Sequence, residues 1–176
     1  MSLEPVYGLV RREQFFETHV VPHMGAAYNL ARWLTRNDHD AEDVVQEAYL
    51  RAFRFWESFH GADARAWLLA IVRNTCFTWL QQNRKPSLEL VEDMPDLKSA
   101  QANPEALLLA NVDAETLRRT VEELPLEFRE AIVLRELEGF SYKEISSITS
   151  APIGTVMSRL ARARTRLQKA LQGGAA

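Results

Sequence analysis

The stretch FSYKEISSITSAPIGTVMSRLARARTRLQKAL, residues 140–171, predicts two helices joined by a short turn. Ser141 and Glu144 have the spacing of a capping box, so the first helix is expected to begin directly after Ser141. Pro152 suits the first turn of the second helix, where a backbone donor has no partner within the helix. Two helices around so tight a turn are typical of a helix-turn-helix, whose second helix enters the major groove of DNA N-terminus first.

The second of these helices is amphipathic. At about 100° per residue, one face is apolar and holds Ile153, Val156, Leu160, Ala163, Leu167 and Leu171. The opposite face holds Thr155, Ser158, Arg162, Thr165 and Lys169, with Arg159 and Arg166 beside it. No carboxylate interrupts these basic residues, although the whole chain has a net charge of −3. A positive stripe on an acidic protein favours contact with a polyanion, and we expect DNA; a solvated basic surface helix is the plain alternative.

The composition is that of a globular protein. The 176 residues are 47% apolar and 26% charged, enough for one medium core or two small ones. The single cysteine, Cys76, excludes an intramolecular disulfide and fits a reducing compartment. The first residues lack the hydrophobic core of a signal peptide, and no apolar run is long enough to cross a bilayer. We therefore expect a cytoplasmic protein without membrane insertion.

Helical spacing dominates the chain and strand alternation is absent, so the predicted fold is all-α. Before the helix-turn-helix, helices are expected over about 12–36 with a break at Pro22, 40–57, 64–83, 104–123 and 126–138. Proline and acidic residues accumulate between the third and fourth of these helices, which indicates a flexible acidic linker. The prediction is two small helical domains, 1–84 and 104–172, joined by a linker over 85–103.

The helix predicted to begin at Asp40, its expected N-cap, has two different faces. A broad apolar stripe faces a core and holds Ala41, Val44, Val45, Ala48, Ala52, Phe55, Trp56 and Phe59. The opposite face carries Asp43, Gln46, Glu47 and Leu50, which we call the carboxylate patch. Two carboxylates, an amide and an exposed leucine suit docking to another protein. A solvated acidic face with an ordinary Glu47–Arg51 pair is the simpler interpretation of this helix taken by itself.

The helix predicted over 64–83 combines aromatic residues with amides and cations. Trp67, Phe77 and Trp79 accompany Arg65, Arg73, Asn74, Gln81 and Gln82, and Arg84 and Lys85 follow. Aromatic rings beside such groups can hold unstacked bases, and stacking contributes about 1–3 kcal/mol per base. Membership of a core explains Trp67, Ile71, Val72 and Cys76 equally well at helical spacing.

Together these segments resemble an extracytoplasmic-function (ECF) sigma factor of bacterial RNA polymerase. DAEDVVQEAYLRAF, residues 40–53, is similar to the core-binding helix of that family. AWLLAIVRN, residues 66–74, is similar to the segment that opens its minus-ten recognition helix. LPLEFREAIVLRELEGFSYKEIS, residues 124–146, and PIGTVMSRLARAR, residues 152–164, resemble its minus-thirty-five domain. The resemblance covers nearly the whole chain in the expected order.

The resemblance implies a factor that binds core RNA polymerase, directs promoter-specific initiation and is controlled by an anti-sigma factor. The carboxylate patch (Asp43, Gln46, Glu47 and Leu50) would dock on the clamp helices of the beta-prime subunit, with further contact to the beta subunit. Promoter DNA would be bound at the minus-ten element by His60, Gly61, Asp63, Arg65, Arg73, Asn74, Arg84 and Lys85. At the minus-thirty-five element it would be bound by Gly154, Thr155, Met157, Ser158, Arg159, Ala161, Arg162, Arg166 and Lys169.

The chain departs from the family pattern at several positions. The family usually has leucine and glycine where this chain has Thr149 and Ser150, a turn that a residue other than glycine can also adopt. It often has a basic residue at Met157 and a bulkier one at Ala161, so its minus-thirty-five sequence preference does not carry over. Ser158 and Arg162 remain the candidates for base edges, and an arginine reading guanine contributes about 1–3 kcal/mol of discrimination.

Three other functions were weighed against this one. A free-standing helix-turn-helix regulator would bind duplex DNA unaided, but it leaves the carboxylate patch without a role. A metalloenzyme could use His19 and His23, with Glu17 nearby, but Pro22 interrupts them and the sequence places no third ligand. The chain has no glycine-rich phosphate loop and no nucleophile motif, so we expect no catalysis, cofactor or metal. An inert helical adaptor does not explain the basic face of the last helix.

Overall fold

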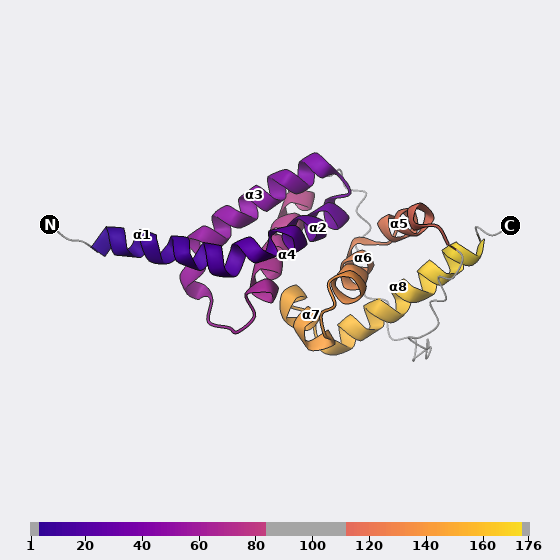
Figure 1. The fold of residues 1–176 in the computed structure, drawn as a ribbon. Helices are drawn as coiled ribbons and strands as arrows, with labels where there is room; N and C mark the ends of the chain where they lie inside the picture. Colours follow the sequence, from indigo (N-terminus) through magenta and orange to yellow (C-terminus); the bar gives the residue numbers. More distant parts are fainter. Residues whose placement is uncertain (1–3, 84–111, 174–176) are drawn as a thin grey trace. The chain divides into compact units, whose positions relative to one another are not determined.

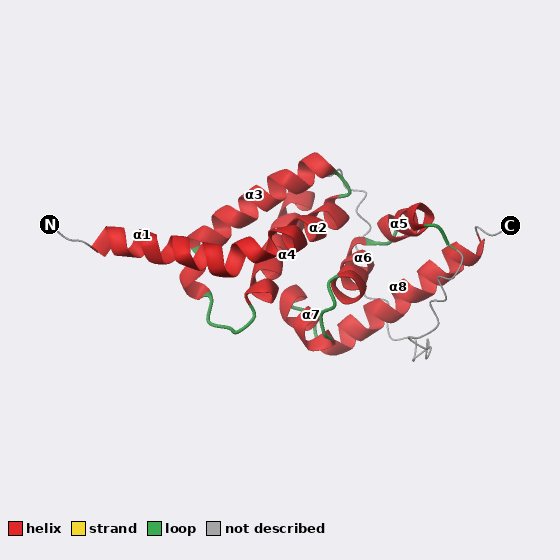
Figure 2. Ribbon diagram, viewed as in Figure 1, coloured by secondary structure: helices red, strands yellow, loops and turns green. Residues whose placement is uncertain are grey.

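A computed structural model describes residues 4–83 and 112–173. Within these ranges the chain forms helices and no strand, which confirms the all-α prediction (Figures 1 and 2). The described residues belong to two compact units, an N-terminal unit within 4–83 and a C-terminal unit mainly within 112–173. The predicted linker over 85–103 and the start of the helix predicted over 104–123 lie outside the described residues, as do Arg84 and Lys85. A single helix over 104–123 is wrong, because Asp113 is the N-cap of a helix that begins at Ala114.

The N-terminal unit is built on helices α2, α3 and α4, which all pack on one another. Its elements are α1 (Glu4–Phe15), a π turn η1 (Phe16–Val20), a 3-10 turn η2 (Val21–His23), α2 (Met24–Thr35), α3 (Asp38–Arg54), a 3-10 turn η3 (Trp56–Ser58) and α4 (Ala64–Asn83). The three packed helices bury small and branched residues, among them Ala27, Leu30, Ala31, Leu34, Ala41, Val44, Ala48, Ala52, Leu68, Leu69, Val72, Cys76 and Leu80. Fully buried alanines let helix backbones approach closely, so this core needs few large side chains.

Helix α3 begins and ends differently from the prediction. Its N-cap is Asn37, whose side-chain oxygen accepts a hydrogen bond from the Asp40 backbone N–H at 3.0 Å. The reason is local, because Arg36 takes a left-handed conformation (φ 58°) that ends α2 and turns Asn37 into the extended geometry of a cap. At the other end α3 stops at Arg54, and Phe55 is 61% exposed instead of joining the apolar stripe.

The C-terminal unit consists of α5 (Ala114–Glu122), α6 (Leu126–Ile132), a π turn η4 (Val133–Leu137), α7 (Tyr142–Thr149) and α8 (Ile153–Gly173). Helix α8 packs on α5 and α6. The core of the C-terminal unit holds Phe128, Ile132, Val133, Leu134, Phe140, Ile145, Ile148, Val156, Leu160, Ala163 and Leu167. The apolar face predicted for the last helix is confirmed for its middle, whereas Ile153 at its start is 45% exposed.

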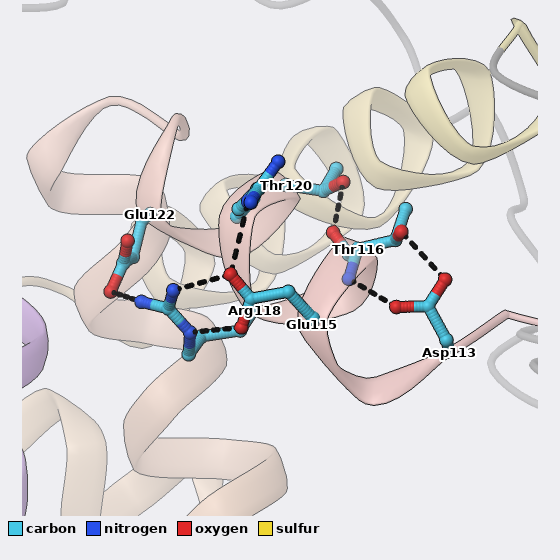
Figure 3. A network of polar contacts seen from close by, with 7 residues as sticks. Asp113, Glu115, Thr116, Arg118, Thr120 and Glu122 are labelled. Atoms are coloured by element: carbon cyan, nitrogen blue, oxygen red, sulfur yellow. Dashed lines mark hydrogen bonds and ion pairs between the residues drawn. The ribbon is translucent and has the colours of Figure 1, made fainter.

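Helix α5 is stabilised at its surface by a polar network (Figure 3). Asp113 caps the helix and accepts hydrogen bonds from the backbone N–H and the hydroxyl of Thr116, at 2.9 and 2.7 Å. One turn later, Arg118 bridges Glu115 and Glu122, with nitrogen–oxygen distances of 2.7 and 2.6 Å. Exposed pairs of this kind are screened by water and contribute little each, so they support α5 without defining the core.

A buried arginine fixes the turn between α5 and α6. Arg129 is only 2% exposed, and its Nη1 donates hydrogen bonds to the backbone carbonyls of Glu122 and Leu124, both at 2.8 Å. These carbonyls belong to the end of α5, where the last turn of a helix leaves acceptors without partners inside the helix. The guanidinium therefore joins the two helices by satisfying acceptors that would otherwise lose a hydrogen bond on burial.

The helix-turn-helix follows the predicted pattern. Ser141 and Glu144 form the capping box, with the Glu144 N–H donating to the serine hydroxyl at 3.2 Å and the Ser141 N–H donating to the carboxylate at 2.7 Å. Helix α7 ends at Ser150, which adopts the left-handed conformation (φ 57°) in place of the family's glycine. The Ser146 hydroxyl donates to the Ala151 carbonyl at 2.6 Å and closes the turn.

Candidate nucleic-acid interface

The carboxylate patch lies on the outer face of α3, away from the buried alanines and valines of the same helix. Asp43 and Gln46 are exposed, and Leu50 is 53% exposed, which confirms that this leucine is outside the core. Glu47 is half-buried and accepts a hydrogen bond from Arg51 Nε at 3.0 Å, while Asp43 lies 3.8 Å from His39 Nε2. These neighbours hold the patch without covering it.

The residues expected at the minus-ten element occupy the loop 59–63 and the exposed side of α4. His60, Gly61, Ala62 and Asp63 are all exposed. The Asp63 carboxylate accepts a hydrogen bond from the Ala66 backbone N–H at 3.0 Å, so it caps α4 and ties down the end of the loop. The loop is therefore short, open to solvent and anchored at its C-terminal end by a helix cap.

Two turns into α4, Arg73 and Asn74 form a polar and aromatic surface. Arg73 Nη1 donates a hydrogen bond to Asn74 Oδ1 at 3.3 Å, and the guanidinium lies 3.7 Å from the centre of the Phe77 ring. A cation over an aromatic ring is attracted by the ring's quadrupole, so Phe77 helps to fix the position of the Arg73 guanidinium. Asn74 is exposed, whereas the nearby Val72 and Cys76 are buried in the core.

A group of ring-bearing side chains, which we call the aromatic cluster, connects the loop 59–63 with α1. It consists of Phe15, Phe16, His19, Phe53, Trp56, Phe59 and Trp67. From the sequence, Trp67 fitted either a core or a base-stacking surface, and Phe15 and His19 had no predicted part in DNA binding. A spacing of four residues in a helix indicates that the Phe15 and His19 rings are neighbours. The contact of both rings with Phe59 depends on the tertiary fold.

The residues expected at the minus-thirty-five element lie on α8 and differ in how they are held. Arg159 is 19% exposed and pairs with Glu127 of α6 at 3.3 Å; Arg164 is 13% exposed and pairs with Glu136 of η4 at 2.7 Å. The Arg166 guanidinium lies 5.1 Å from the centre of the Phe128 ring. The sequence has no carboxylate among the basic residues of α8, but in the folded unit Arg159, and Arg164, which was not among the predicted contacts, pair with carboxylates of other elements. Their carboxylates come from segments about 30 residues earlier in the chain.

The start of α8 presents small and apolar groups to solvent. Met157 is 51% exposed, and a Cβ added to Gly154 would meet no atom within 4 Å. Thr155, Ser158, Ala161 and Arg162 are half-buried, and Lys169 near the end of the helix is exposed. The Ser158 hydroxyl donates to the Thr155 carbonyl at 3.0 Å. One side of this helix thus offers a methyl-rich start followed by hydroxyl and cationic groups, which suits a major groove.

His19, one of the two histidines considered for metal binding, belongs to the aromatic cluster. The His19 ring packs against Phe15 and Phe59, with ring centres 4.9 and 5.5 Å apart. In the residues that the structure describes, no group of three or more histidine, cysteine, aspartate or glutamate side chains gathers as a metal site. The described helices also include none that combines the length and apolarity needed to cross a membrane.

Comparison with known protein families gives two matches. The model of sigma-70 region 2 matches residues 20–85, and the model of sigma-70 region 4 matches residues 114–167. The first range contains the carboxylate patch, the loop 59–63 and α4. The second contains α5 through most of α8.

Individual relatives agree with these matches. The ECF RNA polymerase sigma-E factor of Escherichia coli K12 is 41% identical over 142 residues, which cover 76% of this chain and 74% of the relative. The ECF sigma factor SigE of Mycolicibacterium smegmatis is 34% identical over 147 residues, covering 83% of this chain and 57% of the relative.

Solved structures are similar as well. The sigma factor RpoE in complex with the anti-sigma factor NepR from Bartonella quintana has a TM-score of 0.69 and 28% identity, covering 89% of this chain and 96% of that chain. CnrH in complex with the cytosolic domain of CnrY has a TM-score of 0.62 and 25% identity, covering 90% of this chain and 88% of that chain. On the family matches and the 41% identity, this chain belongs to the ECF sigma factors, which direct RNA polymerase to initiate transcription at promoters.

Proposed function

We propose that this sigma factor divides its work between its two units. The N-terminal unit holds core RNA polymerase through the carboxylate patch and captures the minus-ten element with the loop 59–63 and α4. The C-terminal unit reads the minus-thirty-five element with α8. The observation that carries this proposal is the pair of exposed surfaces of opposite charge, one on α3 and one on α8, that neither core requires.

The carboxylate patch suits a basic helical surface such as the beta-prime clamp helices, with the beta subunit as a further partner. Asp43 and Glu47 lie one helical turn apart, and Leu50 adds an apolar group beside them. Charge complementarity of this kind speeds encounter and fixes register, while burial of the exposed Leu50 on binding would add affinity. The Glu47–Arg51 pair orients one carboxylate before binding.

Capture of the minus-ten element needs no chemistry on the DNA. A pocket that favours an unstacked base over a stacked one is enough, because unstacking costs only a few kcal/mol. His60, Gly61, Asp63 and Arg65 would contact the displaced strand, with Arg73 and Asn74 on the next turns of α4. Arg84 and Lys85 belong to the same proposed surface but lie outside the described residues.

Helix α8 would read the minus-thirty-five element with its first turns and hold the phosphates with the later ones. Gly154, Thr155, Met157, Ser158, Ala161 and Arg162 would face base edges, and Arg159, Arg166 and Lys169 would lie near the backbone. The open space at Gly154 supports close approach of a phosphate to the first turn of the helix. Because Arg159 already pairs with Glu127, DNA would have to compete with that carboxylate for it.

Control by an anti-sigma factor is part of the proposal. It is supported by the two similar solved structures, which are complexes with the anti-sigma factor NepR and with the cytosolic domain of CnrY. We also propose that the protein acts in the cytoplasm, where bacterial RNA polymerase works, and that it catalyses no reaction of its own.

A gel-shift assay separates this function from that of a free-standing regulator. The probe is duplex promoter DNA, with the protein added alone, core polymerase added alone, or both together. We expect a specific complex only with both, because Arg159 and Arg164 are already paired within the protein and its net charge is −3. Specific, tight binding by the isolated protein would favour the regulator instead.

A further inference from the structure

The end of helix α1 is the centre of the aromatic cluster. Among the described residues, the Phe15 ring contacts the rings of Phe16, His19, Trp56, Phe59 and Trp67, at centre-to-centre distances of 6.2, 4.9, 5.7, 5.6 and 5.8 Å. These distances lie in the range where aromatic pairs attract one another in edge-to-face and tilted arrangements. A residue before the first family match at residue 20 therefore organises rings from three later segments.

Phe59, the first residue of the loop 59–63, sits among these rings. Its ring centre lies 5.6 Å from Phe15, 5.5 Å from His19 and 5.5 Å from Trp67. The remaining loop residues are exposed, so Phe59 anchors the N-terminal end of the loop while the Asp63 cap anchors the other end. A loop held at both ends loses less conformational freedom when it binds a ligand than one that must first be ordered.

The backbone at this point is unusual. Phe16–Val20 form a π turn between α1 and the Pro22-containing turn η2, and His19 lies within it. Single π turns inside helices are rare and occur frequently at functional sites. Here the π turn presents both Phe15 and His19 to the same loop residue, with their ring centres 4.9 Å apart.

We propose that Phe15 and His19 are positioning residues for promoter opening. They fix Phe59 and thereby hold the loop 59–63 in the shape that receives an unstacked base of the minus-ten element. This inference rests on the proposed function of that loop. It assigns a role to the N-terminal helix that the family matches do not cover and that no base contact would reveal.

The cluster supplies its own control. Phe53 contacts Phe16, with ring centres 5.3 Å apart, and its ring lies 4.6 Å from the Arg12 guanidinium. Among the described residues, the ring contacts of Phe59 are instead with Phe15, His19 and Trp67. Phe53→Leu removes a ring from the same cluster without touching the loop anchor. Phe15→Leu and His19→Ala each remove a ring that contacts Phe59. His19→Phe keeps an aromatic ring at position 19.

The test uses holoenzyme assembled from core polymerase and each full-length variant. The probe is a fluorescent single-stranded oligonucleotide that carries the non-template minus-ten sequence of a promoter used by the wild-type protein. We expect Phe15→Leu and His19→Ala to weaken oligonucleotide binding about tenfold and to leave core affinity within about twofold of wild type. His19→Phe and Phe53→Leu should bind the oligonucleotide within about twofold of wild type.

Each outcome decides the matter. Wild-type binding by His19→Ala and Phe15→Leu would overturn the positioning role, as would equal losses in Phe53→Leu, which would indicate general loosening of the unit. A loss in His19→Phe as large as in His19→Ala would also contradict it, since a ring alone would not suffice. If wild-type holoenzyme fails to bind the oligonucleotide, the proposed function of the loop fails, a result distinguishable from failure of the positioning role.

Discussion

The two units hold their proposed DNA-contacting segments by different physical means. In the N-terminal unit the loop 59–63 is anchored by ring contacts of Phe59 and by one helix cap. In the C-terminal unit α8 is held to α6 and η4 by ion pairs of Arg159 and Arg164 in addition to its apolar face. Ring packing is insensitive to salt, whereas partly exposed ion pairs weaken as ionic strength rises.

This difference bears on how tightly each unit binds DNA. Cations committed to carboxylates within the protein release fewer counterions when they meet phosphate, so α8 is a weaker polyanion binder than its sequence suggests. We therefore expect most of the affinity for the transcription complex to come from protein–protein contact at the carboxylate patch.

Reversing charge in the carboxylate patch should have the largest effect. The double variant Asp43→Arg, Glu47→Lys places cations where the proposal expects a basic partner, and we expect about a 100-fold loss of affinity for core polymerase, about 3 kcal/mol. Fluorescence titration of core polymerase measures it. Glu13→Lys, a charge reversal at one exposed residue of α1, is the control and should change core affinity little. Unchanged core affinity in the double variant would remove the patch from the interface.

Removing the buried arginine should destabilise the C-terminal unit. Arg129→Met keeps much of the side-chain volume but leaves the Glu122 and Leu124 carbonyls without their donor. We expect a loss of about 2 kcal/mol in the free energy of unfolding, because buried acceptors lose their hydrogen bonds. Arg119→Met breaks only an exposed pair with Glu115 and should cost about 0.5 kcal/mol or less. Urea unfolding of both variants gives the comparison, and equal costs would contradict it.

Arg162→Ala should relax the choice of sequence at one minus-thirty-five position, with a loss of about 1.5 kcal/mol for the preferred base. Lys169→Ala, an exposed cation farther along α8, should weaken all promoters evenly and lower the salt slope by about one. Holoenzyme binding to a promoter library at several salt concentrations separates the two. If Arg162→Ala weakens binding to all promoters equally, Arg162 contacts the phosphate backbone and not a base.

The exposed side chain of Met157 should contact a thymine methyl group, because an apolar side chain on a groove-reading helix has no hydrogen bond to offer a base. Replacing the contacted thymine with uracil should weaken holoenzyme binding about threefold, about 0.65 kcal/mol, close to the burial of one methylene-sized group. Met157→Ala should bind the two DNAs equally. A uracil effect that persists in Met157→Ala would assign the methyl contact to another residue.

The smallest expected effect is a pH dependence at the start of α5. Hydrogen bonds from Thr116 hold the pKa of Asp113 below its ordinary value of 3.8, so the ionised cap stabilises the helix above that pH. This stabilisation should be lost as pH falls through the lowered pKa. The thermal midpoints of wild type and Asp113→Ala, measured between pH 6 and pH 2.5, should therefore converge at the acid end. A difference between the two thermal midpoints that stays the same at every pH would contradict a role for the charge of Asp113.

Features set by local sequence were predictable. The capping box of α7 depends on Ser141 and Glu144, and helix α4 occupies 64–83 as expected. The turn at Ser150 was expected to form without glycine, and the structure adds that Ser150 adopts the left-handed conformation there. In each case neighbouring residues satisfy one another's backbone groups, so the tertiary structure has little to decide.

Features that depend on distant segments were not predictable. Glu127 and Glu136 pair with arginines of α8 about 30 residues away, and nothing in the local pattern of that helix indicates it. The π turn at Phe16–Val20 and the meeting of Phe15, His19 and Phe59 also follow from packing. Asn37 displaced Asp40 as the cap of α3 because the preceding residue, Arg36, ended α2 in a left-handed conformation.

The central claim is that one unit holds the polymerase while the other finds the promoter. Run-off transcription with core enzyme on a promoter library tests it most directly, comparing the wild type with the double variant Asp43→Arg, Glu47→Lys and with Arg162→Ala. We expect defined transcripts from the wild type, almost none from the double variant, and transcripts from an altered set of promoters with Arg162→Ala. Absence of any defined transcript with the wild type, or an unchanged promoter set with both variants, would contradict the account.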